Sequence, residues 1–248
     1  QYNYIINFVN KIKTVIAAGG LGTRLQGFRG NESTKILLEV DGKPMIIRQI
    51  EQLIDWGLEN FIIITNPSFD ELIKDVISSY YPEKNISFTI QHEQKGISHA
   101  LMCAEKYILP GDTVFFILGD NFFEKNPVKN INIDELTKSK GAYIFSYNVE
   151  NPQEFGVAEL DSENNVISIE EKPANPKSKH AVVGIYIYDD SVMDRIRTLK
   201  PSQRGEYEVT DLNNLYIQDE KCKNVTIEGW WVDAGTPDRI IDLEKKLN

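Results

Sequence analysis

The sequence predicts an α/β fold in which a mixed, mostly parallel β-sheet lies between two layers of helices. Short runs of β-branched and aromatic residues, each the length of one buried strand, alternate with helical patterns as far as about residue 150. This alternation is typical of parallel β-α-β units, whose helices cover both faces of the sheet. No linker-like stretch, low-complexity segment or repeat divides the 248 residues. We therefore expect one domain, residues 1–248, with residues 1–12 as an N-terminal extension.

The first half of the chain supplies the strands of the parallel part of the sheet. One helix is expected over residues 45–56, where isoleucines recur on one face, and it ends at Gly57, which can adopt the left-handed conformation of a helix end. A second helix begins with a predicted capping box between Ser68 and Glu71, followed by apolar residues at helical spacing. The five strands expected here are residues 14–17, 61–65, 87–91, 114–118 and 142–147.

The second half of the chain has a different pattern. Three further strand-like runs, residues 155–160, 166–170 and 182–188, are joined by polar turns instead of helices. We therefore expect antiparallel additions to the same sheet. Helices are predicted at residues 191–198, 209–219 and 237–246, the last with Thr236 as its cap and Pro237 in its first turn.

The composition excludes several classes of partner. Acidic residues outnumber basic ones, 37 to 27, which gives a formal net charge of −10 and makes the chain poorly suited to nucleic acid or anionic membranes. Two cysteines, Cys103 and Cys222, are too few for a disulfide-stapled secreted module or a cysteine-built zinc site. Apolar runs such as residues 114–118 are far shorter than the ~20 residues of a membrane span, and residues 1–10 lack a signal-peptide pattern. We therefore expect a cytoplasmic protein.

A glycine-rich segment, residues 17–25, follows the first strand directly and reads Ala-Ala-Gly-Gly-Leu-Gly-Thr-Arg-Leu. Its three glycines allow a sharp bend that brings backbone N–H groups close to a polyphosphate, at the sheet edge where ligands bind. The spacing excludes a P-loop, and it excludes a dinucleotide fingerprint because the third glycine would fall at Leu25. Arg24 adds a positive charge beside these amides. On the glycines alone, a surface turn would be the better interpretation.

The continuation of this segment favours a phosphate site over a turn. Residues 35–46, Lys-Ile-Leu-Leu-Glu-Val-Asp-Gly-Lys-Pro-Met-Ile, follow Gly-Gly-x-Gly-Thr-Arg-Leu and closely resemble the signature of sugar-1-phosphate nucleotidyltransferases. Later segments repeat the resemblance in the family's order, at residues 119–121, 155–157, 170–173, 199–213 and 230–236. Within the family, the chain is most similar to the glucose-1-phosphate thymidylyltransferases and their archaeal relatives, over about residues 13–246.

The resemblance implies a three-layer, Rossmann-like nucleotide-diphospho-sugar transferase fold and a defined reaction. A sugar 1-phosphate, most simply glucose 1-phosphate, would condense with a nucleoside triphosphate, most simply dTTP, to give a nucleotide sugar and pyrophosphate. One alternative is a uridylyltransferase that makes a UDP-sugar, because a glutamine amide can pair with either thymine or uracil. The other is a catalytically silent homologue that binds nucleotide sugars and regulates a partner. The resemblance leaves homo-oligomerisation open.

The resemblance also assigns roles to individual residues. The expected catalytic residues are Arg24, Lys35, Asp120 and Lys172. The expected nucleotide-binding residues are Ala18, Gly19, Gly20, Gly22, Thr23, Gln91 and Gly96, with Gln91 reading the edge of a pyrimidine and Gly96 letting the base lie against the backbone. The expected sugar-phosphate-binding residues are Asn121, Gly156, Glu171, Lys172, Val183 and Trp231. Asp120 and Asp233 are expected to hold Mg²⁺.

The metal assignment also has a physical rationale. Asp120 directly follows the strand 114–118, so its carboxylate is expected at the same sheet edge as the glycine-rich segment. Mg²⁺ commonly takes one or two protein carboxylates and completes its shell with phosphates and water. Asp120 and Asp233 are 113 residues apart, so only the fold can bring them together. Taken alone, each aspartate also fits an ordinary turn, and Glu171-Lys172 fits a charged hairpin.

The sequence departs from these relatives in two places. Lys35 lies eleven residues after Arg24, which makes the intervening loop one residue longer than usual. Residues 92–95, His-Glu-Gln-Lys, replace small and proline-rich residues near the expected base site. We interpret His92 and His99 as surface or hydrogen-bonded histidines and not as ligands.

The net charge of the chain leads to a prediction about how charge is distributed. Two phosphate-rich ligands on a protein of net charge −10 require a local cluster of positive charge. We therefore expect Arg24, Lys35, Lys172, the backbone amides and Mg²⁺ to form one small positive pocket on an otherwise acidic surface.

Overall fold

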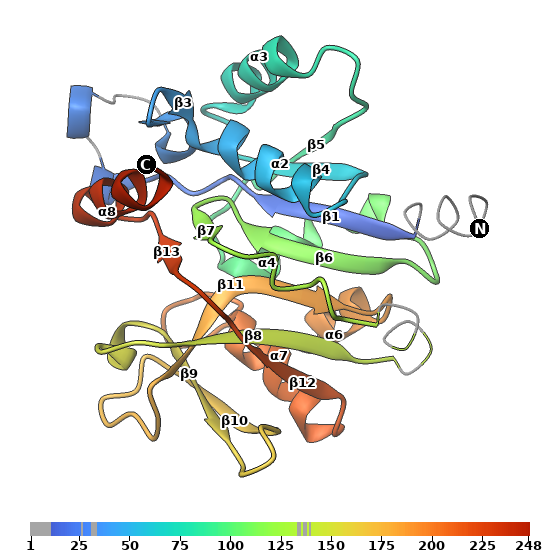
Figure 1. Cartoon of the computed structure of the whole chain (residues 1–248). Helices are drawn as coiled ribbons and strands as arrows, with labels where there is room; N and C mark the ends of the chain where they lie inside the picture. Colours follow the sequence, from blue (N-terminus) through green and yellow to red (C-terminus); the bar gives the residue numbers. More distant parts are fainter. Residues whose placement is uncertain (1–10, 26, 31–33, 133–134, 136–137, 139) are drawn as a thin grey trace.

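The centre of the protein is a nine-stranded mixed sheet (Figure 1). The structure, a computed structural model, describes residues 11–25, 27–30, 34–132, 135, 138 and 140–248. The main strand order is β10-β9-β11-β6-β1-β4-β5, and β8 pairs with both β11 and β12. The parallel part consists of β1 (Ile12–Ala17), β4 (Phe61–Thr65), β5 (Ser87–Ile90) and β6 (Thr113–Leu118). All pairings among these four strands are parallel, with Val15 opposite both Ile62 and Phe116. Four of the five predicted parallel strands are therefore confirmed. The fifth, residues 142–147, pairs antiparallel with residues 180–188 and parallel with residues 222–226.

The second half of the chain adds the antiparallel strands. β11 (His180–Tyr188) pairs antiparallel with β6, with β8 (Ala142–Asn148) and with β9 (Gly156–Leu160), which in turn pairs with β10 (Val166–Glu171). The predicted antiparallel additions are confirmed. A further strand, β12 (Cys222–Thr226), pairs parallel with β8 and was not predicted. Its residues are only partly buried or exposed and include Lys and Asn, so it lacks the apolar run of a buried strand.

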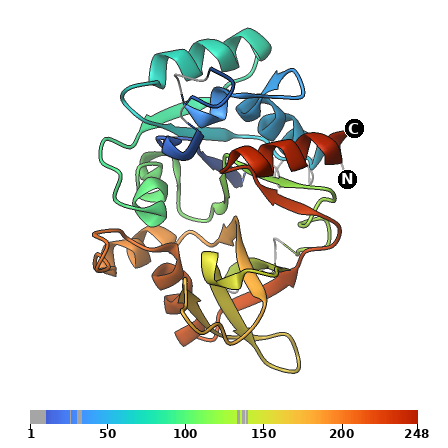
Figure 2. The same ribbon diagram turned by 90° about the vertical axis from the view of Figure 1, so that its left-hand side faces the viewer.

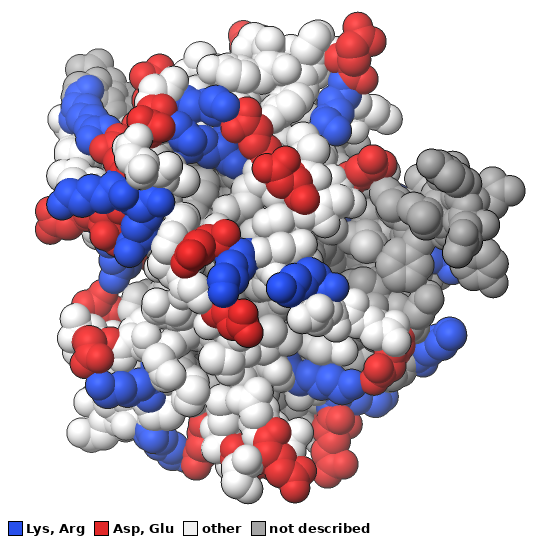
Figure 3. Space-filling view, viewed as in Figure 1, with Lys and Arg blue, Asp and Glu red and all other residues white. Residues whose placement is uncertain are grey.

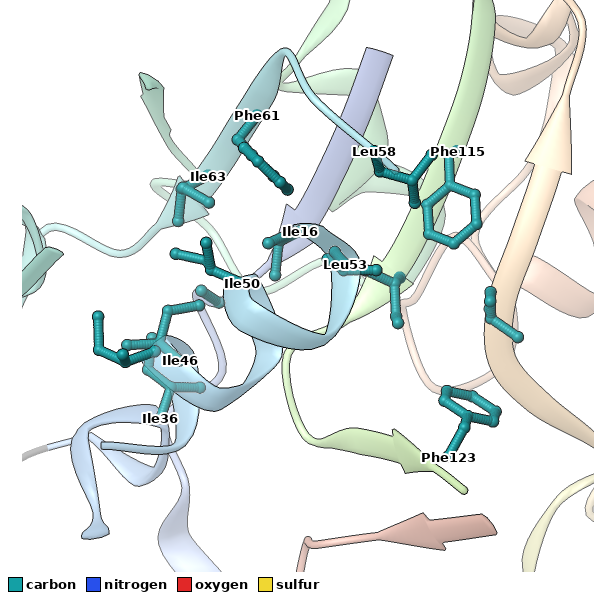
Figure 4. Close-up of a cluster of buried hydrophobic side chains, with 14 of the residues drawn as sticks. Ile16, Ile36, Ile46, Ile50, Leu53, Leu58, Phe61, Ile63, Phe115 and Phe123 are labelled. Atoms are coloured by element: carbon teal, nitrogen blue, oxygen red, sulfur yellow. The ribbon is translucent and has the colours of Figure 1, made fainter. Parts of the chain in front are cut away.

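Helices cover both faces of the sheet, which confirms the three-layer architecture. One face carries α2 (Met45–Asp55) and α3 (Asp70–Tyr80), and the other carries α4 (Ile97–Met102), α6 (Val192–Thr198) and α7 (Val209–Gln218). Alternate residues of β1 point to opposite faces, so Ile16 packs in the first core cluster and Val15 in the second. Figure 4 shows Ile50 and Leu53 of α2 in the first cluster, close to Ile16.

The ends of two helices test the predicted capping. Beyond α2, Gly57 has φ +81°, and Leu58 N–H donates to the Leu53 carbonyl at 3.0 Å, so the predicted left-handed helix end is confirmed. The predicted capping box of α3 is wrong. Asn66 Oδ1 accepts the N–H groups of Ser68 and Phe69, at 3.0 and 3.2 Å, and the helix begins later, at Asp70. An Asx turn therefore replaces the cap, because the asparagine side chain reaches those amides first.

A third core cluster joins the C-terminal helix to the glycine-rich segment and its neighbours. It contains α8 (Pro237–Leu247), β13 (Trp231–Asp233) and β7 (Asn121–Phe123), with Leu25 and Met45 among its buried residues. β13 pairs antiparallel with β7, and β2 (Glu39–Val40) pairs with β3 (Lys43–Pro44) beside α8. Figure 2 shows the red helix α8 on the side of the molecule that also carries the blue N-terminal segments. Short 3₁₀ helices complete the fold: η1 (Thr23–Leu25), η2 (Phe28–Gly30), η3 (Lys35–Leu37), η4 (Glu105–Tyr107) and η5 (Pro152–Glu154).

Two further expectations concern the N-terminal extension and membrane-spanning segments. Residues 1–10, most of the predicted N-terminal extension, lie outside the described residues. Among the described helices, not one combines the length and the apolarity needed to cross a membrane.

The long loop between Arg24 and Lys35 is tied to α8 by an ion pair. Arg29, at φ +55°, donates to both carboxylate oxygens of Glu244, at 2.6 and 2.8 Å. Glu244 Oε1 also accepts the backbone N–H of Asp41 at 3.1 Å. The Arg29 hydrogen bonds lower the pKa of Glu244 to about 2, from a usual value of 4.5.

We expect Glu244→Gln to destabilise the protein at pH 7 by about 1–2 kcal/mol, because two charge-assisted hydrogen bonds lose their charged acceptor. The pKa of Glu244 is lower in the folded state, so this contribution is full above about pH 4.5 and decreases as the pH falls towards 2. Urea unfolding at pH 7 and at lower pH measures both effects. Glu228→Gln, which removes a carboxylate 78% exposed and 3.6 Å from Lys125, is the control and should change stability by less than about 0.5 kcal/mol. Equal midpoints for wild type and Glu244→Gln at pH 7 would contradict the assignment.

Candidate active site

A cavity of about 640 Å³ opens at the carboxyl ends of the parallel strands. Segments that follow β1, β5 and β6 line it together, as expected for an open α/β sheet, and β9, β10 and β11 close its other side. Its volume is within the range of small-molecule sites. Most of the predicted site residues line it: Gly19, Gly20, Arg24, Lys35, Gln91, Gly96, Asp120, Asn121, Gly156, Glu171, Lys172, Trp231 and Asp233.

Four predicted residues are placed elsewhere. Ala18 is fully buried, and its N–H donates to the Ile64 carbonyl at 2.8 Å. Thr23 is exposed in η1. Gly22, at φ +62°, shapes the loop, because a Cβ there would lie 2.8 Å from Lys35 Cβ. Val183 is fully buried in the first core cluster. Successive residues of a strand face opposite sides, so its neighbours Val182 and Gly184 line the cavity and Val183 does not. Val183 can reach a ligand only through its backbone.

Asp120 and Asp233 come together although 113 residues separate them. β7 and β13 pair so that Asp233 lies opposite Asn121, and Ala234 N–H donates to the Asp120 carbonyl at 2.7 Å. Burial and the charge of Asp120 raise the pKa of Asp233 to about 6, whereas the Lys35 ammonium beside Asp120 lowers the pKa of that carboxyl despite its burial. Among the described residues no cluster of three or more His, Cys, Asp or Glu side chains could hold a metal. Mg²⁺ usually binds one or two protein carboxylates together with phosphate and water, so the two carboxylates of this pair fit Mg²⁺.

Three cations surround this carboxylate pair. Lys35 Nζ forms an ion pair and hydrogen bond with Asp120 Oδ2. Arg239 Nη1 donates to Asp233 Oδ2 at 3.2 Å, and its Nη2 donates to Glu154 at 2.7 Å. Arg24 lies close by, because a Cβ on Gly235 would be 3.0 Å from Arg24 Nη2 and 2.9 Å from Asp233 Oδ1. Sequence reasoning missed Arg239, because only the approach of α8 to β13 brings it to the site.

Gln91, Gly19 and Gly96 form one part of the cavity lining. Gly19 allows close packing, because a Cβ there would lie 2.9 Å from the Thr65 carbonyl oxygen and 3.5 Å from Gln91 Oε1. Gly96, at φ +95°, directly precedes α4. A Cβ on Gly96 would lie 2.8 Å from the carbonyl oxygen of Tyr207, in the segment before α7, so there is no room for a side chain. This packing is a reason for glycine at position 96 that the sequence did not indicate. His99 is hydrogen-bonded, as expected, with its Nδ1 3.1 Å from Gln91 Nε2.

Glu171 lies at the centre of a second group of lining residues. Its Oε2 accepts from Thr210 Oγ1 at 2.7 Å, and its Oε1 lies 3.4 Å from Arg204 Nη2. Gly156 lets these groups approach, because a Cβ there would lie 3.2 Å from Thr210 Oγ1 and 3.3 Å from Glu171 Oε2. Lys172 has φ +47°, which directs the chain out of β10 immediately after Glu171. Thr210 and Arg204 lie in segments that resemble the family, but sequence reasoning gave them no role.

Asn121 holds three parts of the cavity wall together. Its Oδ1 accepts from Trp231 Nε1 at 2.8 Å and from Gly184 N–H at 3.0 Å, while its Nδ2 donates to Asp120 Oδ1 at 3.0 Å. A Cβ on Gly184 would lie 2.8 Å from the Asn121 amide, so only glycine fits there. The hydrogen bonds of Asn121 therefore orient Trp231 and Asp120 within the site.

The charge of the side chains that line the cavity bears on the predicted positive pocket, which also included the backbone amides and Mg²⁺. Four basic residues line the cavity, and five acidic residues lie among them, so the side chains alone do not form a positive pocket. The basic residues are Arg24, Lys35, Lys172 and Arg239, and the acidic ones are Asp120, Glu154, Glu171, Glu206 and Asp233. The face in Figure 3 likewise mixes basic and acidic side chains. A bound divalent cation would reverse the sign of the lining.

We expect Asp233→Asn to stabilise the metal-free protein at pH 7.5 by about 1–2 kcal/mol, because it removes a partly buried charge next to Asp120. The pKa of Asp233 is about 6 in the folded state, against a usual 3.8. The Asp233 carboxylate therefore destabilises the fold more as the pH rises from about 4 to above 6, and its effect is small at pH 4. Urea unfolding in a chelator at several pH values measures the gain. Asp242→Asn, at a site 54% exposed, is the control and should be neutral. A variant less stable than wild type at pH 7.5 would contradict this reading of the pair.

Comparisons with known proteins show the family and the fold of the chain. The family model described as nucleotidyl transferase matches residues 13–248. A glucose-1-phosphate thymidylyltransferase of Mycolicibacterium smegmatis is 37% identical over 93% of this chain and 80% of its own length. A Bacillus anthracis structure assigned to the same activity, in complex with sucrose, has a TM-score of 0.83 at 35% identity over 96% of both chains. A UDP-glucose pyrophosphorylase structure, at 22% identity and a TM-score of 0.78 over 95% of this chain and 97% of that one, shares the fold. The chain belongs to the nucleotidyl transferase family.

Proposed function

We propose that this protein transfers a thymidylyl group from dTTP to glucose 1-phosphate, giving dTDP-glucose and pyrophosphate. The observation that carries the proposal is that one cavity is lined together by a carboxylate pair, Lys35, Gln91 and Glu171. The named activity of relatives such as the one from M. smegmatis supports the choice of substrates. The UDP-glucose pyrophosphorylase likeness concerns the fold alone, so it does not favour UTP.

The proposed reaction is an in-line displacement at phosphorus. A phosphate oxygen of glucose 1-phosphate forms a bond to the α-phosphorus of dTTP, and the bond from that phosphorus to the β-phosphate oxygen breaks, so pyrophosphate leaves with the electron pair. The attacking phosphate is already ionised, so no protein base is required. Catalysis then consists of positioning the two substrates and stabilising charge.

Six of the nine charged residues that line the cavity have a place in this scheme. Arg24 and Lys35 bind the triphosphate and stabilise the charge that gathers on the leaving pyrophosphate. Lys172 holds the phosphate of the sugar, and Glu171 accepts hydrogen bonds from its hydroxyls. Asp120 and Asp233 would hold Mg²⁺, which would neutralise triphosphate charge when bound.

We expect Lys35→Ala and Asp120→Asn each to lower kcat/KM for pyrophosphate release by at least about 100-fold, since each removes charge stabilisation at the reacting phosphates. Lys43→Ala is the matched control, because Lys43 pairs with Glu51 at 2.7 Å and should be dispensable. The assay covers four triphosphates and several sugar phosphates with Mg²⁺. Near-normal release by both site variants would overturn the roles, and a preference for UTP would replace the thymidylyl assignment with the uridylyl one. Tight nucleotide-sugar binding by wild type without turnover would favour a silent homologue.

We expect Thr210→Val to raise KM for glucose 1-phosphate about ten-fold while KM for dTTP stays within two-fold. The reason is that Thr210 Oγ1 holds Glu171 at 2.7 Å, and valine keeps the shape but loses the hydroxyl. Thr210→Ser retains the hydroxyl and should behave like wild type. Equal effects of Thr210→Val on both KM values would argue against a separate sugar end of the cavity.

A further inference from the structure

The amide of Gln91 is held in one orientation by groups that line or lie behind the cavity wall. Gln91 is only 4% exposed, and one atom of its amide lies 3.2 Å from the carbonyl oxygen of Gly96. A carbonyl oxygen can only accept, so that amide atom must be the nitrogen, because two oxygens at this distance would repel each other. The amide oxygen then lies on the side of Gly19, 3.5 Å from where a Cβ of that residue would be.

His99 fixes the same amide from a second direction. Its Nδ1 lies 3.1 Å from Gln91 Nε2, and because that nitrogen carries only hydrogens, Nδ1 must accept. The imidazole is therefore neutral, with its proton on Nε2. Both hydrogens of the Gln91 amide are now taken by protein acceptors, and only Oε1 is free to meet a ligand in the cavity.

The surroundings of His99 favour this neutral state. The ring stacks on Tyr207, with centroids 6.3 Å apart and an interplanar angle of 23°. Burial and the Lys95 ammonium lower the pKa of His99 below its usual 6.5, although the Glu93 carboxylate, which is paired with Lys95, acts in the opposite direction. His99 is thus an acceptor near neutral pH and becomes a donor only in acid.

We propose that His99 is a positioning residue that makes the site select bases with a ring N–H, thymine or uracil, over cytosine. This inference rests on the proposed function insofar as Gln91 is taken to meet the base. With Nε2 held by His99 and Gly96, Gln91 presents an acceptor alone. The N3–H of thymine or uracil donates to that oxygen, whereas N3 of cytosine carries a lone pair and would be repelled by it.

Protonation of His99 reverses the arrangement. An imidazolium presents an N–H at Nδ1, which is repelled by the amide NH₂ and attracts the amide oxygen. Gln91 then turns Oε1 towards His99 and gives up its hydrogen bond to Gly96. The cavity now meets an NH₂ donor, which suits the lone pair of cytosine N3 and not the N–H of thymine. Selectivity between the bases should therefore follow the titration of a residue that touches neither of them.

Calorimetric binding of dTTP, dUTP and dCTP, with Mg²⁺ and at pH values from about 5 to 8, tests the proposal. His99→Asn places an amide oxygen near the position of Nδ1 and keeps a non-titrating acceptor, while His99→Phe keeps the stacking on Tyr207 and removes the acceptor. Ionisation of the triphosphate is common to all three ligands, so it cancels in the ratio of their affinities. The ratio of dTTP to dUTP is the internal control, since both bases carry the same N3–H.

At pH 8 we expect wild type and His99→Asn to prefer dTTP over dCTP by roughly 100-fold, and His99→Phe to lose about ten-fold of that preference. In wild type the preference should decrease through a midpoint below pH 6.5, and in His99→Asn it should stay constant. The ratio of dTTP to dUTP should not change. Wild-type selectivity in His99→Phe, equal binding of dTTP and dCTP by wild type, or a flat wild-type profile would each overturn the proposal.

A parallel turnover measurement separates this proposal from the proposed function. Wild type that discriminates between the bases in binding but releases no pyrophosphate with any sugar phosphate would refute the function and leave the role of His99 standing. Turnover with dTTP together with unchanged selectivity in His99→Phe would do the reverse. The pH series on wild type needs no variant, so a His99→Phe protein that failed to fold would not remove the test.

Discussion

The closeness of two carboxylates, the buried Asp120 and the partly buried Asp233, is the constraint on which the rest of the site depends. The β7–β13 pairing and the hydrogen bond from Ala234 N–H to the Asp120 carbonyl bring the two side chains together, and burial together with the charge of Asp120 raises the pKa of Asp233. Such a pair persists only if cations compensate it. Lys35 and Arg239 are hydrogen-bonded to it, and Arg24 lies beside it. The carboxylates therefore explain why the site draws on three separate parts of the chain.

Each compensating cation needs its own structural support, and this explains features that look unrelated to the cavity. Gly22 must be glycine because the backbone and side chain of Lys35 occupy the space of its Cβ. Arg239 reaches Asp233 because the third core cluster seats α8 on β13. The same helix is tied through Glu244 to Arg29 in the loop between Arg24 and Lys35, and Lys35 at the end of that loop is hydrogen-bonded to Asp120. Residues 26 and 31–33 of that loop lie outside the described residues.

The sequence predicts features that depend on neighbouring residues better than features that depend on contacts between distant parts of the chain. Strands β1, β4, β5 and β6 and the end of α2 at Gly57 depend on local apolar patterns and backbone freedom, and these were predicted correctly. The capping box at Ser68 failed because Asn66, a residue outside that pattern, competes for the same amides. Thr210 and Arg204 were missed because their partner Glu171 lies 39 and 33 residues away along the chain. Arg239 was missed although its partner Asp233 is only six residues away, because the packing of α8 sets the direction of the turn between them. The placement of Val183 shows that a shift of one residue along a strand exchanges core for cavity.

The acidic character of the chain has a consequence for how phosphates reach the site. With five acidic and four basic residues, the cavity lining does not by itself attract a free triphosphate, and the net charge of −10 repels it at longer range. A triphosphate that arrives with a divalent cation carries less charge and would bring the metal ion that Asp120 and Asp233 are proposed to hold. The carboxylates that oppose a bare anion would thus become ligands for its counterion. An acidic protein can in this way select metal-complexed nucleotides over other polyanions, with no need for the broad basic surface that would also bind nucleic acid.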